Sequence, residues 1–314
     1  MVSRPGSSRS MPVELVDRLS HQLDSEARRV GQAVDAFFTD LLSSPGDSRE
    51  DLYSAMRHAA VGGGKRLRPL LTIAAARLFA IDPERALRAG CAIEAIHVYS
   101  LIHDDLPCMD DADLRRGKPA VHKAYNEAVA VLAGDSLHAL AFEIIAHPAT
   151  HDDPWVRSDL SLELAKAVGP SGMAGGQVMD LMAEGLALDL PAVTRLQQLK
   201  TGALIEFAVE AACIMGRIDP QARTPYRGYA RNIGLAFQIA DDLLDHSGDE
   251  AAAGKRLGKD ADAGKATFVS LLGEDRARQQ ARLLVDQAIE HLGDHGREAD
   301  LLRAIAHFAA ERDH

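Results

Sequence analysis

The stretch from Pro83 to His103 constrains the fold more than any other part of this sequence, because it reads as a nearly all-apolar helix. A helix that is apolar on every side must be covered on every side by other elements. Hydrophobic residues make up 46% of the chain and aromatic residues only 4%, so the core must be built from Ala, Leu, Ile and Val. Ala and Leu favour helices, whereas strands favour β-branched and aromatic residues. The sequence therefore predicts an all-α fold with this helix buried inside it.

Apolar residues recur at helical spacing along most of the chain, and no alternating run is long enough to suggest a sheet. No repeat or linker divides the chain. We expect a flexible tail at 1–12 and one domain at 13–314, a single-domain bundle of about ten helices. The expected helices are Val13–Leu42, Arg49–Ala60, Pro69–Ala80, Pro83–His103, Asn126–Ala146, Trp155–Val168, Pro191–Met215, Pro225–Asp245 and Asp275–Arg312.

The charge and cysteine content exclude several classes of protein. The net charge is −11, which argues against a nucleic-acid partner because such proteins need a basic face. The three cysteines are odd in number and far apart, which predicts no disulfide framework and fits a reducing cytosol. No apolar run approaches the length of a membrane span, and the N-terminus lacks the apolar core of a signal peptide. We expect a soluble, cytoplasmic protein without stable membrane insertion.

Two clusters of aspartates follow apolar helical stretches. The first is Asp104, Asp105, Asp110 and Asp111, and the second is Asp241, Asp242 and Asp245. An acidic run is usually a solvated helix end, but negative charge at the C-terminal end of a helix is opposed by the helix dipole. Two such arrangements require a cation, and hard oxygen ligands suit Mg²⁺ better than zinc. The pair of clusters therefore predicts metal binding.

Cations lie near both clusters. The glycine-rich turn Gly62–Pro69 carries Lys65, Arg66 and Arg68 before a predicted helix, a combination suited to an anion. Further cations stand in four later segments: Arg115-Arg116, Lys200-Thr201-Gly202, Lys255-Arg256 and Gly264-Lys265. None is a nucleotide-binding P-loop, because neither Lys65 nor Lys265 is followed by Ser or Thr. Metal ions that bridge carboxylates to a diphosphate, with Lys and Arg around it, account for both kinds of cluster.

These segments together resemble the ordered motif set of trans-prenyl diphosphate synthases. The resemblance rests on "GGGKRLRP", "IHVYSLIHDDLPCMDDADLRRGKP", "GQVMDL", "KTG", "FQIADDLLD" and "GKDADAGKAT", which run from Gly62 to Thr267 in the family's order. Pro107-Cys108 supplies the two extra residues of the first aspartate motif that occur in the bacterial farnesyl and the bacterial and plant geranylgeranyl branches. The set is highly specific, and it implies an all-α fold around a central cavity, usually in a homodimer.

The resemblance also implies roles for individual residues. Asp104 and Asp110 would hold Mg²⁺ with Asp105 or Asp111, and Asp241 would hold it with Asp242 or Asp245; the family uses roughly three ions per site, and Mn²⁺ can substitute. The diphosphate of isopentenyl diphosphate would meet Lys65, Arg68, His97 and Arg116. The allylic diphosphate would meet Arg115, Lys200 and Lys255, with Lys265 among the substrate-binding cations, while Thr201 and Gln238 would face the developing carbocation. His97 lies seven residues before Asp104, on the same helical stripe. Gln177 and Asp180 are equally consistent with a structural role.

The implied reaction is ionisation of the allylic diphosphate, attack by isopentenyl diphosphate, and loss of a proton. A class I terpene cyclase uses only one diphosphate, against which Lys65, Arg68 and His97 argue. A noncatalytic partner subunit tends to lose one aspartate motif, and both are intact here. Product length rests on Tyr99 and Ser100, five and four residues before Asp104. A single aromatic residue there favours farnesyl diphosphate, with geranylgeranyl or geranyl diphosphate as the alternative.

Overall fold

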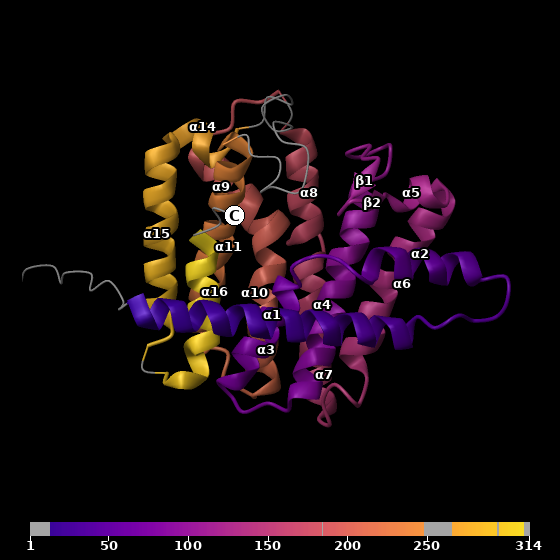
Figure 1. The fold of residues 1–314 in the computed structure, drawn as a ribbon, viewed down its shortest axis with the longest axis horizontal. Coiled ribbons are helices and arrows are strands. Elements are labelled where there is room, and N and C mark those ends of the chain that lie inside the picture. The colour runs from indigo at the N-terminus through magenta and orange to yellow at the C-terminus, as the bar shows by residue number, and fades with distance from the viewer. Residues whose placement is uncertain (1–12, 184, 248–265, 294, 311–314) are drawn as a thin grey trace, which may run out of the picture.

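The computed structural model describes residues 13–183, 185–247, 266–293 and 295–310, and it is helical nearly throughout (Figure 1). The all-α prediction is confirmed. In chain order the elements are α1 (Val13–Leu41), α2 (Glu50–Ala60), α3 (Leu67–Arg77), α4 (Pro83–Asp104), β1 (Leu114–Arg115), β2 (Lys118–Pro119), α5 (Val121–Ala124), α6 (Glu127–Ala146), α7 (Pro154–Val168), α8 (Met173–Met182), α9 (Leu190–Gln197), a π-helix (Gln198–Gly202), α10 (Ala203–Met215), α11 (Thr224–Ser247), α14 (Phe268–Leu272), α15 (Glu274–His291), a 3₁₀ turn (Arg297–Ala299) and α16 (Asp300–Ala310).

Helix α4 is the buried helix that the sequence predicts. Asp82 caps its first turn by accepting hydrogen bonds from the backbone N–H groups of Glu84 and Arg85, and Pro83 opens the helix. An unbroken run from Ala89 to Ile96 is buried, so every side of the helix is covered there. It packs between α3 and α6, and α1 lies across the bundle in front of it (Figure 1). The helix therefore delivers its C-terminal aspartates to one end of the core.

The first aspartate cluster leads into a short β-hairpin. Strands β1 and β2 pair antiparallel, with Arg115 opposite Lys118 and Leu114 opposite Pro119. The two turn residues, Arg116 and Gly117, both have positive φ, as a two-residue hairpin turn requires. The expectation of no sheet missed this hairpin, because strands of two residues leave no alternating pattern to detect.

The expected C-terminal helix Asp275–Arg312 is wrong as one element. Helix α15 ends at His291, Gly293 adopts φ +52°, and α16 begins only at Asp300. Glycine readily takes such a left-handed conformation and so ends a helix. Helix α8 was also missed, because its start is rich in glycine. The expected tail at 1–12 lies outside the described residues.

Helix α6 is more apolar than the sequence argument allowed. Among the described helices it is the one that is long and apolar enough to cross a membrane by length and composition, with a mean hydropathy of 1.6 over its best window. The expectation that no run approaches that length was therefore too strict. The inner side of α6 packs against α4, α2 and α7, as in a core helix.

Candidate active site

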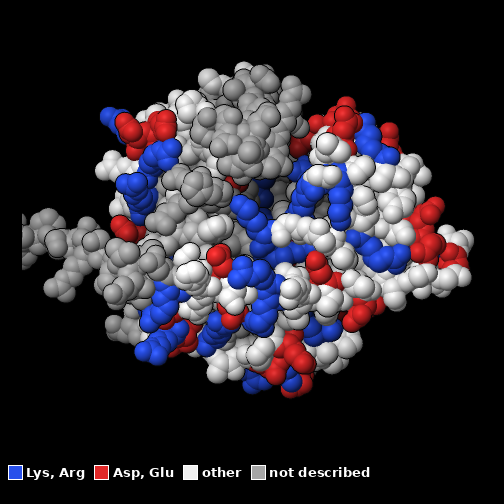
Figure 2. All heavy atoms as spheres, viewed as in Figure 1, with Lys and Arg blue, Asp and Glu red and all other residues white. Residues whose placement is uncertain are grey.

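One cavity collects residues from five separate parts of the chain. Seven predicted site residues line it, namely Lys65, Arg68, His97, Arg116, Thr201, Gln238 and Asp241. They come from the turn before α3 together with the first turn of α3, from α4, from the hairpin, from the π-helix and from α11. Lys and Arg side chains gather around a hollow near the middle of the face in Figure 2. The fold thus brings together residues that lie more than a hundred positions apart.

The glycine-rich turn before α3 is anchored by a buried ion-pair network. Arg66 is buried and has φ +47°, an unfavourable conformation for a residue with a side chain. Its guanidinium donates to Glu94 of α4 at 2.8 Å, to Asp35 of α1 at 2.6 Å and to the carbonyl of Ala60 at 2.6 Å. The Asp35 carboxylate also accepts the backbone N–H of Gly62 at 3.2 Å. Paired and hydrogen-bonded in this way, the buried charges fix the turn in place.

Sequence reasoning missed Asp35 and Glu94. A signal existed for Glu94, because it is an acid in the middle of an otherwise apolar buried helix, three residues before His97. A buried charge needs a partner of opposite charge, and the predicted anion site contains Arg66 as a candidate. Nothing in the sequence marked Asp35 among the many acids of α1.

Arg68 and His97 lie at the electropositive centre of the cavity. Burial and the neighbouring Arg116 lower the pKa of Arg68, although Glu94 opposes this. The Nε atom of Arg68 is buried and has no hydrogen-bond partner among the described residues. Burial, then the charges of Arg68 and Arg116, hold the pKa of His97 well below its usual range. His97 is therefore neutral, and it can offer an anion one N–H rather than a positive charge.

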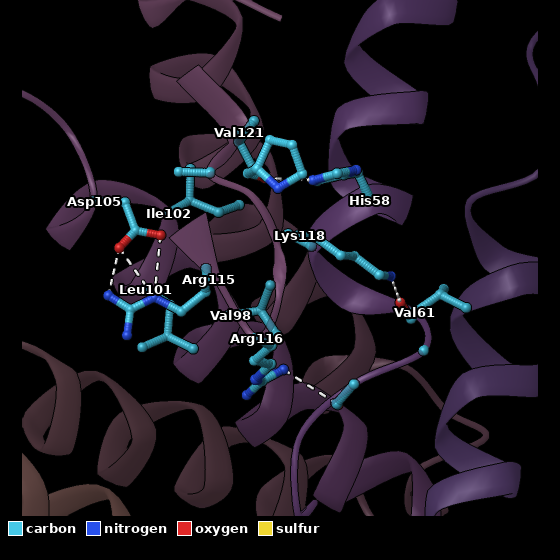
Figure 3. A pocket seen from close by; sticks show the side chains of 15 residues that line it. His58, Val61, Val98, Leu101, Ile102, Asp105, Arg115, Arg116, Lys118 and Val121 are labelled. Carbon is cyan, nitrogen blue, oxygen red and sulfur yellow. Dashed lines mark hydrogen bonds and ion pairs between the residues drawn. The ribbon is translucent and has the colours of Figure 1, made fainter. Parts of the chain in front are cut away.

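The hairpin places its two arginines differently. Arg115 forms a bidentate pair with the buried carboxylate of Asp105 (Figure 3). Burial lowers the pKa of Arg115, but its hydrogen bond to Asp105 and the charge of Asp105 outweigh this and raise it. Arg116 instead lies over the glycine-rich turn and donates to the carbonyl of Gly63 at 3.2 Å. Arg116 thus lines the cavity, whereas Arg115 is paired with Asp105.

Of the remaining carboxylates of the first cluster, Asp111 lies 4.0 Å from the Nζ atom of Lys123. Asp104 is half-buried and its side chain makes no hydrogen bond among the described residues. Burial raises the pKa of Asp104 to about 6; Lys200 opposes this shift, and the like charges of Asp110 and Asp105 add to it. Asp110 and Asp111 are exposed, and the backbone N–H of Asp110 donates to the Asp104 carbonyl at 2.8 Å. Burial and like charges destabilise the ionised form of the Asp104 carboxyl, and a bound cation would offset that cost, which fits a metal site.

The second cluster lies on α11 as expected, with Asp241 and Asp245 one turn apart. Asp242 is buried, and its carboxylate accepts the backbone N–H of Phe268 at 2.8 Å, next to the start of α14. This contact ties Asp242 to the fold. Within the described part of the chain, no three carboxylate, imidazole or thiol groups converge closely enough to hold a metal by themselves. The chemistry of the donor set, all carboxylate oxygens, fits Mg²⁺ or Mn²⁺.

Lys200 and Thr201 lie in the π-helix between α9 and α10. π-Helical turns are rare and often occur at functional sites. Lys200 forms an ion pair with Asp180 of α8 at 2.7 Å. Helix α8 can approach this closely because Gly176 has no side chain: a Cβ there would lie 2.1 Å from the backbone nitrogen of Lys200. The "GQVMDL" segment therefore has a structural part in Gly176 and Asp180, while the Nε2 of Gln177 is buried without a hydrogen-bond partner in the described residues.

Tyr99 lies on α4, five residues before Asp104 and toward the middle of the helix. Its ring packs edge-on against His103 and His138, with centroid distances of 5.7 Å and 5.0 Å. His138 packs in turn against Phe142 of α6. Burial and the charge of Asp104 raise the pKa of Tyr99 to about 12. Ser100 donates to the carbonyl of His97 at 2.8 Å, one turn back along the helix. Lys255 and Lys265 lie outside the described residues.

Comparison with known proteins agrees with this geometry. Residues 49–306 match the polyprenyl synthetase family. The chain is 40% identical to a farnesyl diphosphate synthase of Escherichia coli K12, a match that covers 93% of this chain and 98% of the relative. It is 46% identical to a chloroplastic geranylgeranyl pyrophosphate synthase of Arabidopsis thaliana, over 83% of this chain and 74% of the relative.

Solved structures give the same result. An FPP/GFPP synthase from Zymomonas mobilis superposes with a TM-score of 0.86 at 56% identity, and the match covers 92% of this chain and 99% of that one. A geranyltransferase from Legionella pneumophila superposes with a TM-score of 0.82 at 30% identity, over 93% and 98% of the two chains. The segment that matches the family, residues 49–306, includes every residue that lines the cavity.

Proposed function

Because this chain belongs to the polyprenyl synthetase family and is a prenyltransferase, we propose that it joins isopentenyl diphosphate to dimethylallyl or geranyl diphosphate and releases farnesyl diphosphate. One observation carries the proposal. The isopentenyl-binding set of Lys65, Arg68, His97 and Arg116 shares one cavity with Thr201, Gln238 and Asp241. A cavity with this many cations suits two diphosphate groups, which a one-substrate terpene cyclase does not need.

Divalent ions, Mg²⁺ or Mn²⁺, would be held by Asp104 and Asp110 on one wall and by Asp241 with Asp245 on the other. Asp105 and Asp242 are less suited to this, because Arg115 and the Phe268 backbone already engage them. When bound, such ions neutralise the leaving diphosphate. Since no three ligands among the described residues converge on one point, the diphosphate would have to supply further oxygen ligands to such an ion.

The chain's own residues would contribute charge, orientation and exclusion of water. The charge of Lys200 opposes the rise in the pKa of Asp104, so the two side chains lie near each other. This supports a position for Lys200 beside the allylic diphosphate. The oxygen atoms of the Thr201 hydroxyl and the Gln238 amide would face the carbocation and stabilise its positive charge. Lys65 lies over the Phe308 ring, 5.7 Å from its centroid, beside Phe237 of the cavity wall. These rings would shield the carbocation from water.

The product is most consistent with farnesyl diphosphate. Tyr99 lies about 7.5 Å below Asp104 along α4, given five residues at the helical rise. Its ring is backed by His138 and Phe142, so a growing tail that is anchored near Asp104 would meet an aromatic wall. Geranylgeranyl diphosphate is the second candidate, because the plant relative with 46% identity is a geranylgeranyl pyrophosphate synthase.

The test is product chromatography of the purified chain with Mg²⁺, isopentenyl diphosphate and geranyl diphosphate. A main product of fifteen carbons is expected, and none in excess EDTA or without isopentenyl diphosphate. A cyclic product from geranyl or farnesyl diphosphate alone would identify a terpene cyclase instead. Absence of any product from the chain alone would point to a noncatalytic subunit.

We further propose a homodimer formed through α6. This helix buries one side against the core, yet Val131 and Leu132 on its other side are 40% and 56% exposed. A helix that is apolar on both sides is normally covered on both sides. A second copy of α6 would cover the outer side and explain why this helix alone, among those described, has the composition of a membrane span.

A further inference from the structure

The turn before α3 and the β1–β2 hairpin carry the cations for the same proposed diphosphate, yet fifty residues separate them in sequence. The turn is fixed, because Arg66 is held by Asp35 and Glu94 in a buried network. Among the described residues the hairpin has no such network. Its one ion pair there joins Arg115 to Asp105, at the end of α4.

The hairpin residues themselves lie mostly outside the core, since Leu114 and residues 116–119 are exposed. A small pocket lies between the hairpin and α4, with Val98, Leu101 and Ile102 on one side of it (Figure 3). Core burial holds the chain on either side, at Ala112 and Ala120. Polar contacts therefore add to this burial in setting the position of the hairpin itself.

Three hydrogen bonds join the hairpin to the end of α2 and the turn that follows (Figure 3). Lys118 donates to the carbonyl of Val61 at 3.1 Å, and Arg116 donates to the carbonyl of Gly63 at 3.2 Å. The Nε2 of His58 lies 2.8 Å from the carbonyl of Pro119. A carbonyl only accepts, so His58 must carry its proton on Nε2.

These bonds oppose an electrostatic repulsion. Arg116 lies among Arg66, Arg68 and Arg115, and burial followed by the charges of Arg66 and Arg115 lowers its pKa, although Glu94 opposes this. Its guanidinium fills the space above Gly64, where a Cβ would lie 2.5 Å from the Arg116 Cζ. Without a diphosphate between them, the cations favour separation of the hairpin from the turn.

We propose that Lys118 and His58 are positioning residues that fasten the hairpin to the turn, so that Arg116 is preorganised on the diphosphate of isopentenyl diphosphate. Lys118 pairs with Arg115 across the hairpin and is only two residues from Arg116. Fixing Lys118 and Pro119 therefore fixes Arg116. This inference rests on the proposed function and adds two residues that touch neither substrate.

Lys118→Met keeps the aliphatic stem and removes the donor. We expect the KM for isopentenyl diphosphate to rise roughly 3- to 10-fold, the effect of one hydrogen bond, with kcat and the KM for geranyl diphosphate within about twofold. His58→Leu should act in the same direction. Lys166→Met removes an equal charge from a lysine on α7 that pairs with Glu163, and it should change nothing.

A double-mutant cycle separates positioning from a general structural effect. If Lys118 acts through Arg116, then Lys118→Met should have no further effect on the KM or on calorimetric isopentenyl diphosphate binding in an Arg116→Ala background. Additive effects, or an unchanged KM in Lys118→Met, would overturn the proposal. A wild-type chain that neither binds isopentenyl diphosphate nor forms product would overturn the proposed function and this inference together. Binding by the wild type with no loss in Lys118→Met would overturn this inference alone.

Discussion

At the scale of single residues, Asp104 lowers the stability of the folded protein and is also a proposed metal ligand. Its pKa of about 6 lies above the usual value of 3.8, chiefly because the half-buried carboxylate is desolvated. The folded state therefore holds a proton more tightly than the unfolded state. Stability from this group is full below about pH 4 and is lost as the pH rises through about 6.

Asp104→Asn should accordingly stabilise the metal-free protein at pH 8. The shift of about two pKa units sets an upper limit of about 3 kcal/mol, and partial exposure reduces it. We expect the gain in unfolding free energy over wild type to grow between about pH 4 and pH 7 and to vanish at lower pH. Turnover should fall by orders of magnitude. Denaturant unfolding in EDTA at several pH values measures the gain, and an equal effect at pH 4 and pH 8 would rule out this cause.

Tyr99→Ala is expected to lengthen the product. Removing the ring opens an apolar cavity beside His138 and Phe142, where a longer tail gains burial. The main product should shift from fifteen toward twenty or more carbons, with the first condensation largely intact. Tyr99→Phe keeps the ring and should keep the product. Chromatography of the dephosphorylated products compares the three proteins, and unchanged length in Tyr99→Ala would leave Tyr99 as ordinary core.

At the scale of elements, the sequence was most informative where periodicity was long and buried. The bounds of α4 and α6 came out within one or two residues, whereas the expected helix Pro191–Met215 is divided by the π-helix at Gln198–Gly202. The sequence did not predict the hairpin, α8 or the break after His291. Each of these depends on the backbone angles of a few residues or on one close contact between two helices. The motif residues converged as expected, but their anchors Asp35 and Gly176 are recognisable only once α1 and α8 are in place.

The contact between α8 and the π-helix gives a prediction for Gly176. A methyl group there would overlap the backbone of Lys200, so Gly176→Ala must push the two elements apart. We expect a loss of about 1–3 kcal/mol in unfolding free energy and a higher KM for the allylic substrate. Gly31→Ala is the matched control, since it lies in a helix with open space around the added methyl. It should be neutral or stabilising by up to about 1 kcal/mol, and equal losses in both variants would dismiss the close-contact argument.

At the scale of the whole molecule, one continuous hydrophobic core joins α1 to α16. The outer side of α6 is one of the places where large apolar side chains reach the surface. Leu132→Asp should therefore dissociate the proposed dimer, because a charge would be buried in the interface. Sedimentation velocity should show a monomer with unchanged helical circular dichroism. Leu162→Asp, at a leucine of α7 that is 54% exposed, is the control and should leave the dimer intact.

The π-helix also has a consequence for insertions and deletions in the polypeptide during evolution. A π turn contains an extra residue relative to an α turn, so deleting one residue from Gln198–Gly202 would restore a regular helix. That deletion would also rotate everything on one side of it by about 100° relative to the other. Lys200 would then turn away from Asp180 while α9 and α10 stayed helical. Because α10 is buried along nearly its whole length, insertions and deletions within Gln198–Gly202 should cost core packing as well as the Lys200–Asp180 ion pair.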